Sequence, residues 1–217
     1  MTAADRGGWR SGYWLVLILI GISYAVCATQ KTPDPSAFAL FIQLATVAVI
    51  LRVAEQKNVV RRAGWIVLAA AALALVTVWL VGGSGRLLDL LFSGTSMVLY
   101  LIAPIAIIAQ QAKKDHVDGQ TLLAAVAAYV LIGMAFTFAY NFIALASSAP
   151  VFGPGTVNSL ADQLFFSFST LTTTGYGNLV PVGAAGQSVA IGEAITGQLF
   201  LVIAVARVVS GWRARTD

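Results

Sequence analysis

Residues that build enzyme and metal sites are scarce in this chain. Its 217 residues include one cysteine, Cys27, which excludes an intrachain disulfide and any cysteine-cluster metal site. The single histidine, His116, lies in a charged polar stretch, as a solvated side chain would, and a pH-sensing role is the alternative. Nucleophile–base pairs and phosphate-binding loops are also absent, so we expect no enzyme and no organic cofactor.

Charge is scarce as well. Only 10% of the residues are charged, whereas 59% are hydrophobic, a composition typical of an integral membrane protein surrounded by lipid. The net charge of +4 could suggest a nucleic-acid partner. In a membrane protein, however, an excess of basic residues usually reflects topology, so we expect no nucleic-acid binding.

Long apolar runs are abundant. Six of them are long enough to cross about 30 Å of hydrocarbon. They lie near residues 13–29, 37–54, 65–82, 88–110, 121–146 and 187–210. The amphipathic segment 159–172 is too short to cross and predicts a re-entrant helix shielded from lipid by other protein. The predicted fold class is therefore an all-α membrane protein, with six transmembrane helices plus a re-entrant helix and the loop that follows it.

Basic residues predict the orientation. Those that six spans place on one side are Arg6, Arg10, Arg52, Lys57, Arg61, Arg62, Lys113, Lys114, Arg207, Arg213 and Arg215. Only Lys31 and Arg86 fall opposite, so the positive-inside rule predicts a multi-pass protein of the cell (inner) membrane with both termini cytoplasmic. The first span also fits a signal peptide ending at Val26-Cys27-Ala28, but we expect an uncleaved span.

One stretch between the last two spans specifies a chemistry: Thr170-Leu171-Thr172-Thr173-Thr174-Gly175-Tyr176-Gly177-Asn178-Leu179-Val180-Pro181. A potassium ion leaving water needs oxygen ligands, and backbone carbonyls facing one axis can supply them. Successive carbonyls can face one way only if alternate residues lie near the left-handed region, which glycine reaches without steric cost. Gly175 and Gly177 have this spacing. Tyr176 would turn its ring outward, and the Thr173 hydroxyl could add an oxygen.

This stretch resembles the selectivity filter of potassium channels, whose motif reads Thr-x-Gly-Tyr-Gly. The resemblance runs without a gap from Phe165-Phe166-Ser167-Phe168-Ser169-Thr170, at the pore-helix position, to Pro181 and into the last span, where Gly197 lies at the family's gating-hinge glycine. It implies a member of the tetrameric potassium channel superfamily, of the six-transmembrane bacterial type. The implied K⁺ ligands are carbonyl oxygens of Thr173, Thr174, Gly175 and Tyr176. An ordinary Gly-Tyr-Gly turn is the alternative.

Two positions depart from the usual family pattern. Thr174 replaces valine, which should matter little because the ligand is a carbonyl. Asn178 replaces aspartate and Ser169 stands where some relatives carry glutamate, so the carboxylate pair that braces some filters is absent. We expect support for the filter from Phe165, Phe166 and Phe168 packed around Tyr176, and from Ser169, Thr170, Asn178 and Glu193.

Glu193 lies well inside the last span, where a carboxylate is costly unless it has a partner or faces water. One hypothesis is a hydrogen bond behind the filter to Ser169 or Thr170, which would replace the missing brace. A ring of carboxylates that concentrates cations in the cavity and a neutral structural carboxyl are the alternatives.

The re-entrant helix has a predicted beginning and a predicted role. Ser159-Leu160-Ala161-Asp162 fits a capping box, with Ser159 as N-cap. The opposite, negative end of the helix dipole would point at the pore centre, where four such ends favour a cation.

The fourth span lacks the charges of a voltage sensor. Leu87 to Ile108 contains no Arg or Lys, only Asp89 near one end, and Pro104 interrupts its helical ladder. Because each charge moved across the field contributes about 2.3 kcal/mol per 100 mV, this helix gives the field almost nothing to act on. We expect voltage-independent behaviour and a scaffolding role for the first four spans.

The predicted domains are a voltage-sensor-like peripheral domain without gating charges (1–112), a cytoplasmic linker (113–120) and a pore domain (121–217). In the pore domain we expect Tyr140 and Asn141 to pack and hydrogen-bond, and Arg207 to snorkel to the membrane interface. No gating domain is expected after the last span, since the chain stops at Asp217.

One filter motif per chain predicts a homotetramer that passes potassium passively, because a carbonyl cage around an axis needs several contributions. A weakly selective cation channel is one alternative. The other is a non-conducting structural or regulatory subunit that needs a different partner chain.

Overall fold

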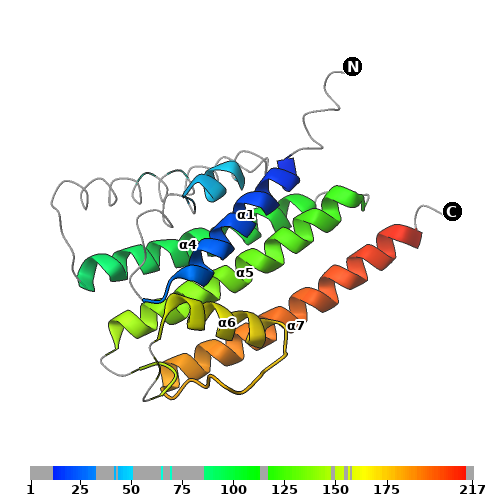
Figure 1. The fold of residues 1–217 in the computed structure, drawn as a ribbon. Coiled ribbons are helices and arrows are strands. Elements are labelled where there is room, and N and C mark those ends of the chain that lie inside the picture. Colours follow the sequence, from blue (N-terminus) through cyan, green and yellow to red (C-terminus); the bar gives the residue numbers. More distant parts are fainter. Residues whose placement is uncertain are drawn as a thin grey trace.

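The computed structural model describes residues 12–32, 42, 44–50, 65, 69, 86–112, 117–147, 150–153, 156 and 158–213. These residues form helices and no strand (Figure 1). The helices are α1 (Gly12–Thr29), α4 (Arg86–Gln111), α5 (Gly119–Ala146), α6 (Leu160–Leu171) and α7 (Ala184–Arg213). Most of the predicted spans 37–54 and 65–82 lies outside the described residues, as do the linker residues Lys113, Lys114 and His116.

Among the described residues, three helices are long and apolar enough to cross a membrane: α4, α5 and residues Ala184–Ser210 of α7. They correspond to the predicted spans 88–110, 121–146 and 187–210. A shorter apolar helix, Tyr13–Thr29, corresponds to the first predicted span. The all-helical class is therefore confirmed for the described residues, whereas six spans and the membrane position of α6 stay predictions.

α1, α4 and α5 share one hydrophobic core. Their buried side chains include Val16 and Ile20 of α1, Tyr100 and Ile107 of α4, and Leu131 of α5. Small residues of α5 lie in the same cluster and let neighbouring helices approach closely: Ala124, Ala127, Ala128 and Ala135. This core crosses the predicted boundary at 113–120, although the domain division itself stays a prediction.

Polar contacts fix α4 against α5. The Ser93 hydroxyl donates to the carbonyl oxygen of Phe138 at 3.0 Å, and the Asn141 amide donates to Ser93 Oγ at 3.3 Å. At one end, the Arg86 guanidinium donates to the carbonyl oxygens of Leu145, Ala146 and Ser147, with distances of 2.7, 3.2 and 2.9 Å. The last carbonyls of a helix lack intrahelical partners and carry partial negative charge, so a cation stabilises the end of α5.

The helices before and after the predicted filter, α6 and α7, both begin at one end of the bundle (Figure 1). α6 begins near the end of α5, and the following loop returns to that end, where α7 begins (Figure 1). At the opposite end lie the start of α1, the end of α4, the start of α5 and the end of α7 (Figure 1). This course brings α6 into contact with α1, α5 and α7.

Candidate functional site

α6 begins with the predicted capping box. The Ser159 hydroxyl accepts from the Asp162 amide at 3.1 Å, and the Asp162 carboxylate accepts from the Ser159 amide at 3.3 Å. Two further amides of the first turn donate to the segment after α1: Leu160 to the carbonyl oxygen of Thr32 and Ala161 to that of Gln30, both at 3.2 Å. The capping box is confirmed, and α1 contributes to the same helix start.

Gly133 on α5 leaves room for an aromatic ring of α6. A Cβ built on Gly133 would lie 2.7 Å from Phe168 Cζ, so the Phe168 ring occupies the space that a side chain would need. The other side of this ring meets Tyr24 of α1 edge-on, with the centroids 5.3 Å apart. Phe168 therefore fixes α6 between α1 and α5.

The loop after α6 alternates in backbone conformation. Positive φ angles occur at Thr173 (58°), Gly175 (56°) and Gly177 (78°), with one residue between each pair. The glycines reach this region without steric cost. Thr173 is β-branched, and the left-handed conformation costs an L-residue roughly 1–2 kcal/mol. The alternation is the one required to aim successive carbonyls in one direction.

The amides of this loop bond back to α6. Thr173 N donates to the Thr170 carbonyl at 2.9 Å, and Thr174 N and Gly175 N donate to the Ser169 carbonyl at 2.8 and 3.0 Å. Within the described part of the chain, the carbonyl oxygens of residues 173–176 accept no hydrogen bond, and these residues are exposed. The loop therefore presents four consecutive carbonyl groups without a protein partner.

The aromatic residues of α6 divide between two environments. The Phe165 ring stacks on Tyr176, with the centroids 5.4 Å apart. Phe166 instead packs against Tyr140 and Phe152, at centroid distances of 5.0 and 4.9 Å. Phe168 lies against α1 and α5 instead, so among the described residues of one chain Phe165 is the one of these three rings that stacks on Tyr176, and packing of all three around the filter stays a prediction.

The polar residues expected to support the loop act mainly through their backbone. Ser169 and Thr170 supply the carbonyls that accept from the loop amides, and the Ser169 hydroxyl donates to the Phe166 carbonyl at 3.1 Å. Asn178 is exposed and makes no hydrogen bond within the described residues.

Glu193 is fully buried and joins three helices. The Tyr140 hydroxyl of α5 donates to Oε2 at 2.7 Å, and the Ser167 hydroxyl of α6 lies 2.5 Å from Oε1. The expected partners, Ser169 and Thr170, are therefore not the observed ones, and the described chain gives Glu193 no open cavity. Ser167 was missed because the sequence does not tell which face of α6 meets α7.

The contacts around Glu193 require three hydrogens. Ser167 Oγ lies 2.5 Å from Glu193 Oε1 and 2.8 Å from the Gly133 carbonyl oxygen, but a hydroxyl carries one hydrogen. The Tyr140 hydroxyl supplies one more, for Oε2. If Glu193 were ionised, one of the two contacts of Ser167 Oγ would have no hydrogen between its oxygens. A protonated Glu193 supplies this third hydrogen. The geometry fits the neutral structural carboxyl among the three hypotheses.

Gly197 lies at a close approach between helices. A Cβ built there would clash with the carbonyl oxygen of Leu171, the last residue of α6. The same carbonyl accepts from the Tyr129 hydroxyl of α5 at 3.0 Å. α7 is one helix from Ala184 to Arg213 across this point, so the structure gives Gly197 a packing role, and the hinge stays a prediction.

Comparisons with known proteins agree with this site. Residues 126–211 match a family model described as "Ion channel", and this range contains α6, the loop and most of α5 and α7. Over 56 residues the chain is 39% identical to Protein LctB of Bacillus caldotenax. The aligned segment is 26% of this chain and spans 41%, less than half, of that relative. No solved structure matches this chain. The family match supports an ion channel superfamily protein that transports ions across a membrane.

Proposed function

We propose that four copies of this chain form a potassium-selective channel that conducts passively. The main support is the loop of residues 173–177, which combines alternating positive φ angles with four carbonyl groups that accept no hydrogen bond from the described residues. Such carbonyls can replace the hydration shell of K⁺, with Thr173, Thr174, Gly175 and Tyr176 as ligands. The Thr173 hydroxyl adds an oxygen at the inner end of the row.

We propose a homotetramer because a single chain leaves the ring of carbonyl oxygens open and most of α7 uncovered. A single chain supplies one row of carbonyls, and Tyr176, the last residue of that row, is 68% exposed. The most apolar window of α7 is nearly as apolar as that of α5, yet only 11% of it is buried inside the chain. Neighbouring copies around an axis would close the cage of oxygens and cover this helix.

The proposed membrane arrangement keeps the six spans of the sequence prediction, with α6 as a re-entrant pore helix. Its capped start faces the outer side, and the negative end of its dipole points inward, where four such ends stabilise a cation. Both termini lie in the cytoplasm of a cell whose inner membrane holds the protein. The described α4 contains no Arg or Lys from Leu87 to Ile108, so we propose gating that does not depend on voltage.

A weakly selective cation channel is the second candidate. Asn178 is exposed and Ser169 bonds to its own helix, so the described chain has no carboxylate pair behind the filter. A filter that is less firmly braced can widen and admit sodium.

The test is ion flux through the purified protein in liposomes. We expect potassium flux that exceeds sodium flux, is blocked by barium and changes little with voltage. Gly175→Ala and Gly177→Ala place a side chain at a positive φ angle and should abolish flux while leaving assembly unchanged. Gly183→Ala is the matched control, because nothing lies within 4 Å of the added Cβ.

Two outcomes would contradict the proposal. Equal sodium and potassium flux would replace it with the weakly selective channel. A complete absence of flux at every voltage, from protein that forms stable tetramers, would favour a non-conducting subunit.

A further inference from the structure

Two threonine hydroxyls join the loop after α6 to the end of that helix. Thr172 Oγ1 lies 2.7 Å from the carbonyl oxygen of Phe168 and 2.8 Å from Thr174 Oγ1. A carbonyl oxygen only accepts, so the single hydrogen of the Thr172 hydroxyl points to Phe168. The Thr174 hydroxyl must therefore donate to Thr172. Two hydrogen bonds in series thus run from the loop back to the last turn of α6.

The threonine between these two takes no part in this hydroxyl chain. Within the described part of the protein, the Thr173 hydroxyl makes no hydrogen bond. Of three consecutive threonines, Thr172 and Thr174 tie the loop to α6, whereas Thr173 keeps its hydroxyl for another partner, such as the proposed K⁺.

The backbone beside Thr174 shows what the hydroxyl chain holds in place. Thr174 N and Gly175 N both donate to the Ser169 carbonyl oxygen. In a planar trans peptide the N–H and the C=O point in opposite directions, so an amide that donates towards α6 directs the preceding carbonyl away from α6. These two bonds therefore orient the carbonyls of Thr173 and Thr174. The hydroxyl chain adds a third tie, through the Thr174 side chain.

The second half of the row has no such backbone ties. The amides of Tyr176 and Gly177 share peptide planes with the carbonyls of Gly175 and Tyr176, and they donate no hydrogen bond within the described residues. The peptide between Thr174 and Gly175 is thus the last one of the row that is tied to α6. Rotation of this peptide would turn the Thr174 carbonyl away from the other oxygens.

We propose that Thr174 is a positioning residue for ion selectivity, and that its hydroxyl, through Thr172, takes the place of the carboxylate brace that Ser169 and Asn178 do not supply. The sequence-based expectation for Thr174 considers its carbonyl alone, whereas the structure also gives its side chain a contact. Valine has a similar shape but cannot donate, so it cannot complete the hydroxyl chain. The effect on selectivity rests on the proposed function, whereas the brace itself does not.

Ion flux through the full chain in liposomes tests the selectivity role. Thr174→Val removes the donor, so we expect potassium flux to continue while the ratio of potassium to sodium flux falls roughly two- to tenfold, the factor that corresponds to one net hydrogen bond. Thr174→Ser keeps the hydroxyl and should restore the ratio. Thr172→Val removes the acceptor and should lower the ratio as well. The double valine variant should be no worse than the more affected single variant, because both substitutions break the same chain.

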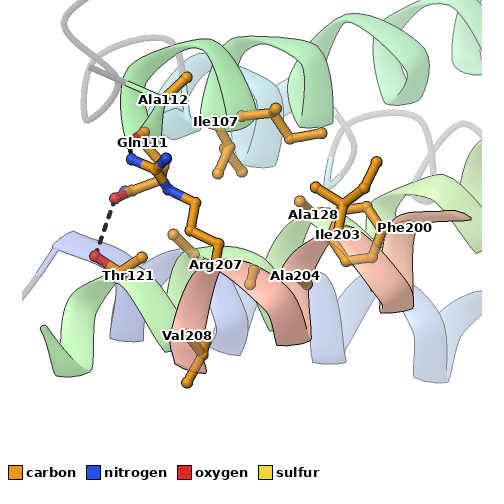
Figure 2. A pocket seen from close by; sticks show the side chains of 13 residues that line it. Ile107, Gln111, Ala112, Thr121, Ala128, Phe200, Ile203, Ala204, Arg207 and Val208 are labelled. Carbon is orange, nitrogen blue, oxygen red and sulfur yellow. Dashed lines mark hydrogen bonds between the residues drawn. The ribbon is translucent and has the colours of Figure 1, made fainter. Parts of the chain in front are cut away.

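Thr121→Val is the matched control. The Thr121 hydroxyl also contacts two groups, since it lies 3.3 Å from Gln111 Oε1 and 2.9 Å from Asp118 Oδ1. Figure 2 shows it beside Gln111, near the start of α5 and therefore at the end of the bundle opposite the loop. We expect this variant to lower thermal stability and to leave the flux ratio unchanged. A general loss of stability is thereby separated from a loss of positioning.

Hydrogen exchange measured by mass spectrometry reports on the brace without any need for conduction. Relative to the intrinsic rates of each sequence, the amides of Thr174 and Gly175 should exchange faster in Thr174→Val and at the original rate in Thr174→Ser. An unchanged flux ratio in a conducting Thr174→Val variant would overturn the proposal. If the unaltered protein shows no flux, the channel proposal fails and exchange decides on the brace: faster exchange in Thr174→Val supports it, and unchanged exchange overturns it.

Discussion

α5 and α7 are similar in length and apolar character but differ in what covers them. In the most apolar window of α5, 56% of the residues are buried inside the chain, against 11% in α7. Among the described side chains of α7, the buried ones are Gly186, Glu193 and Gly197. α5 is thus held by a broad hydrophobic face. α7 buries few residues within its chain, and its further contacts include the half-buried Phe200 ring beside Tyr129 and a hydrogen bond from Arg207 to the Gln111 carbonyl oxygen. We expect such a helix to be covered by partners outside the chain.

The largest effect should come from Gly197→Ala. The added Cβ meets a backbone oxygen of Leu171, which cannot rotate away, so α7 must shift. Overpacking of this kind costs about 1–3 kcal/mol, and we expect lower thermal stability together with lost flux. Both are measured on detergent-solubilised and reconstituted protein.

Gly192→Ala on the same helix is the control, because nothing of its own chain lies within 4 Å. Unaltered stability in Gly197→Ala would contradict the close packing of α7 on α6. A loss of stability in Gly192→Ala would indicate that another copy covers that face of α7.

The second effect concerns Glu193. Glu193→Ala leaves the Tyr140 hydroxyl without its acceptor, whereas Ser167 can still donate to the Gly133 carbonyl oxygen, and a buried hydroxyl left unsatisfied costs about 1–3 kcal/mol. Glu193→Gln can accept from Tyr140 and donate to Ser167, as a protonated carboxyl does. The alanine variant should lose roughly 5 °C or more in melting temperature, and the glutamine variant much less.

Differential scanning fluorimetry of the purified protein makes this comparison. If glutamine proves as damaging as alanine, the carboxyl is charged and the contacts around Ser167 must be distributed differently.

The smallest effect should come from Arg86→Gln. This residue lies where α4 packs on α5, and both helices belong to the same chain. The variant loses the cation at the end of α5, an interaction that contributes about 0.3–1 kcal/mol. Lys31→Gln removes the same charge from an exposed position and serves as the control. Chemical denaturation should show an equal loss in assembled and dissociated protein, and a loss confined to the assembled form would contradict the division between α5 and α7.

Local signals in the sequence predicted the parts of the site that depend on local geometry. Gly175 and Gly177 have positive φ angles, and Ser159 with Asp162 caps α6. Each feature depends on residues a few positions apart. The additional left-handed residue, Thr173, was not predicted, because threonine avoids this region unless its surroundings impose it.

Contacts between helices were predicted less well. Glu193 was recognised as a buried carboxyl that needs a partner, but Ser167 and Tyr140 lie 26 and 53 residues away in the chain. The choice of Ser167 over Ser169 depends on the rotation of α6 about its axis. That rotation is set by packing, including the Phe168 ring against Gly133, which no pattern within α6 encodes.

The start of α6 depends on a segment that lies outside the region matched by the family model. That region begins at residue 126 and leaves out α1. Here the first turn of α6 donates two amides to carbonyls of Gln30 and Thr32, and Phe168 packs on Tyr24. Removing α1 and the segment that follows it would leave two amides without these acceptors and one face of an aromatic ring uncovered. The start of α6 in this protein therefore depends on residues 12–32 of its own chain.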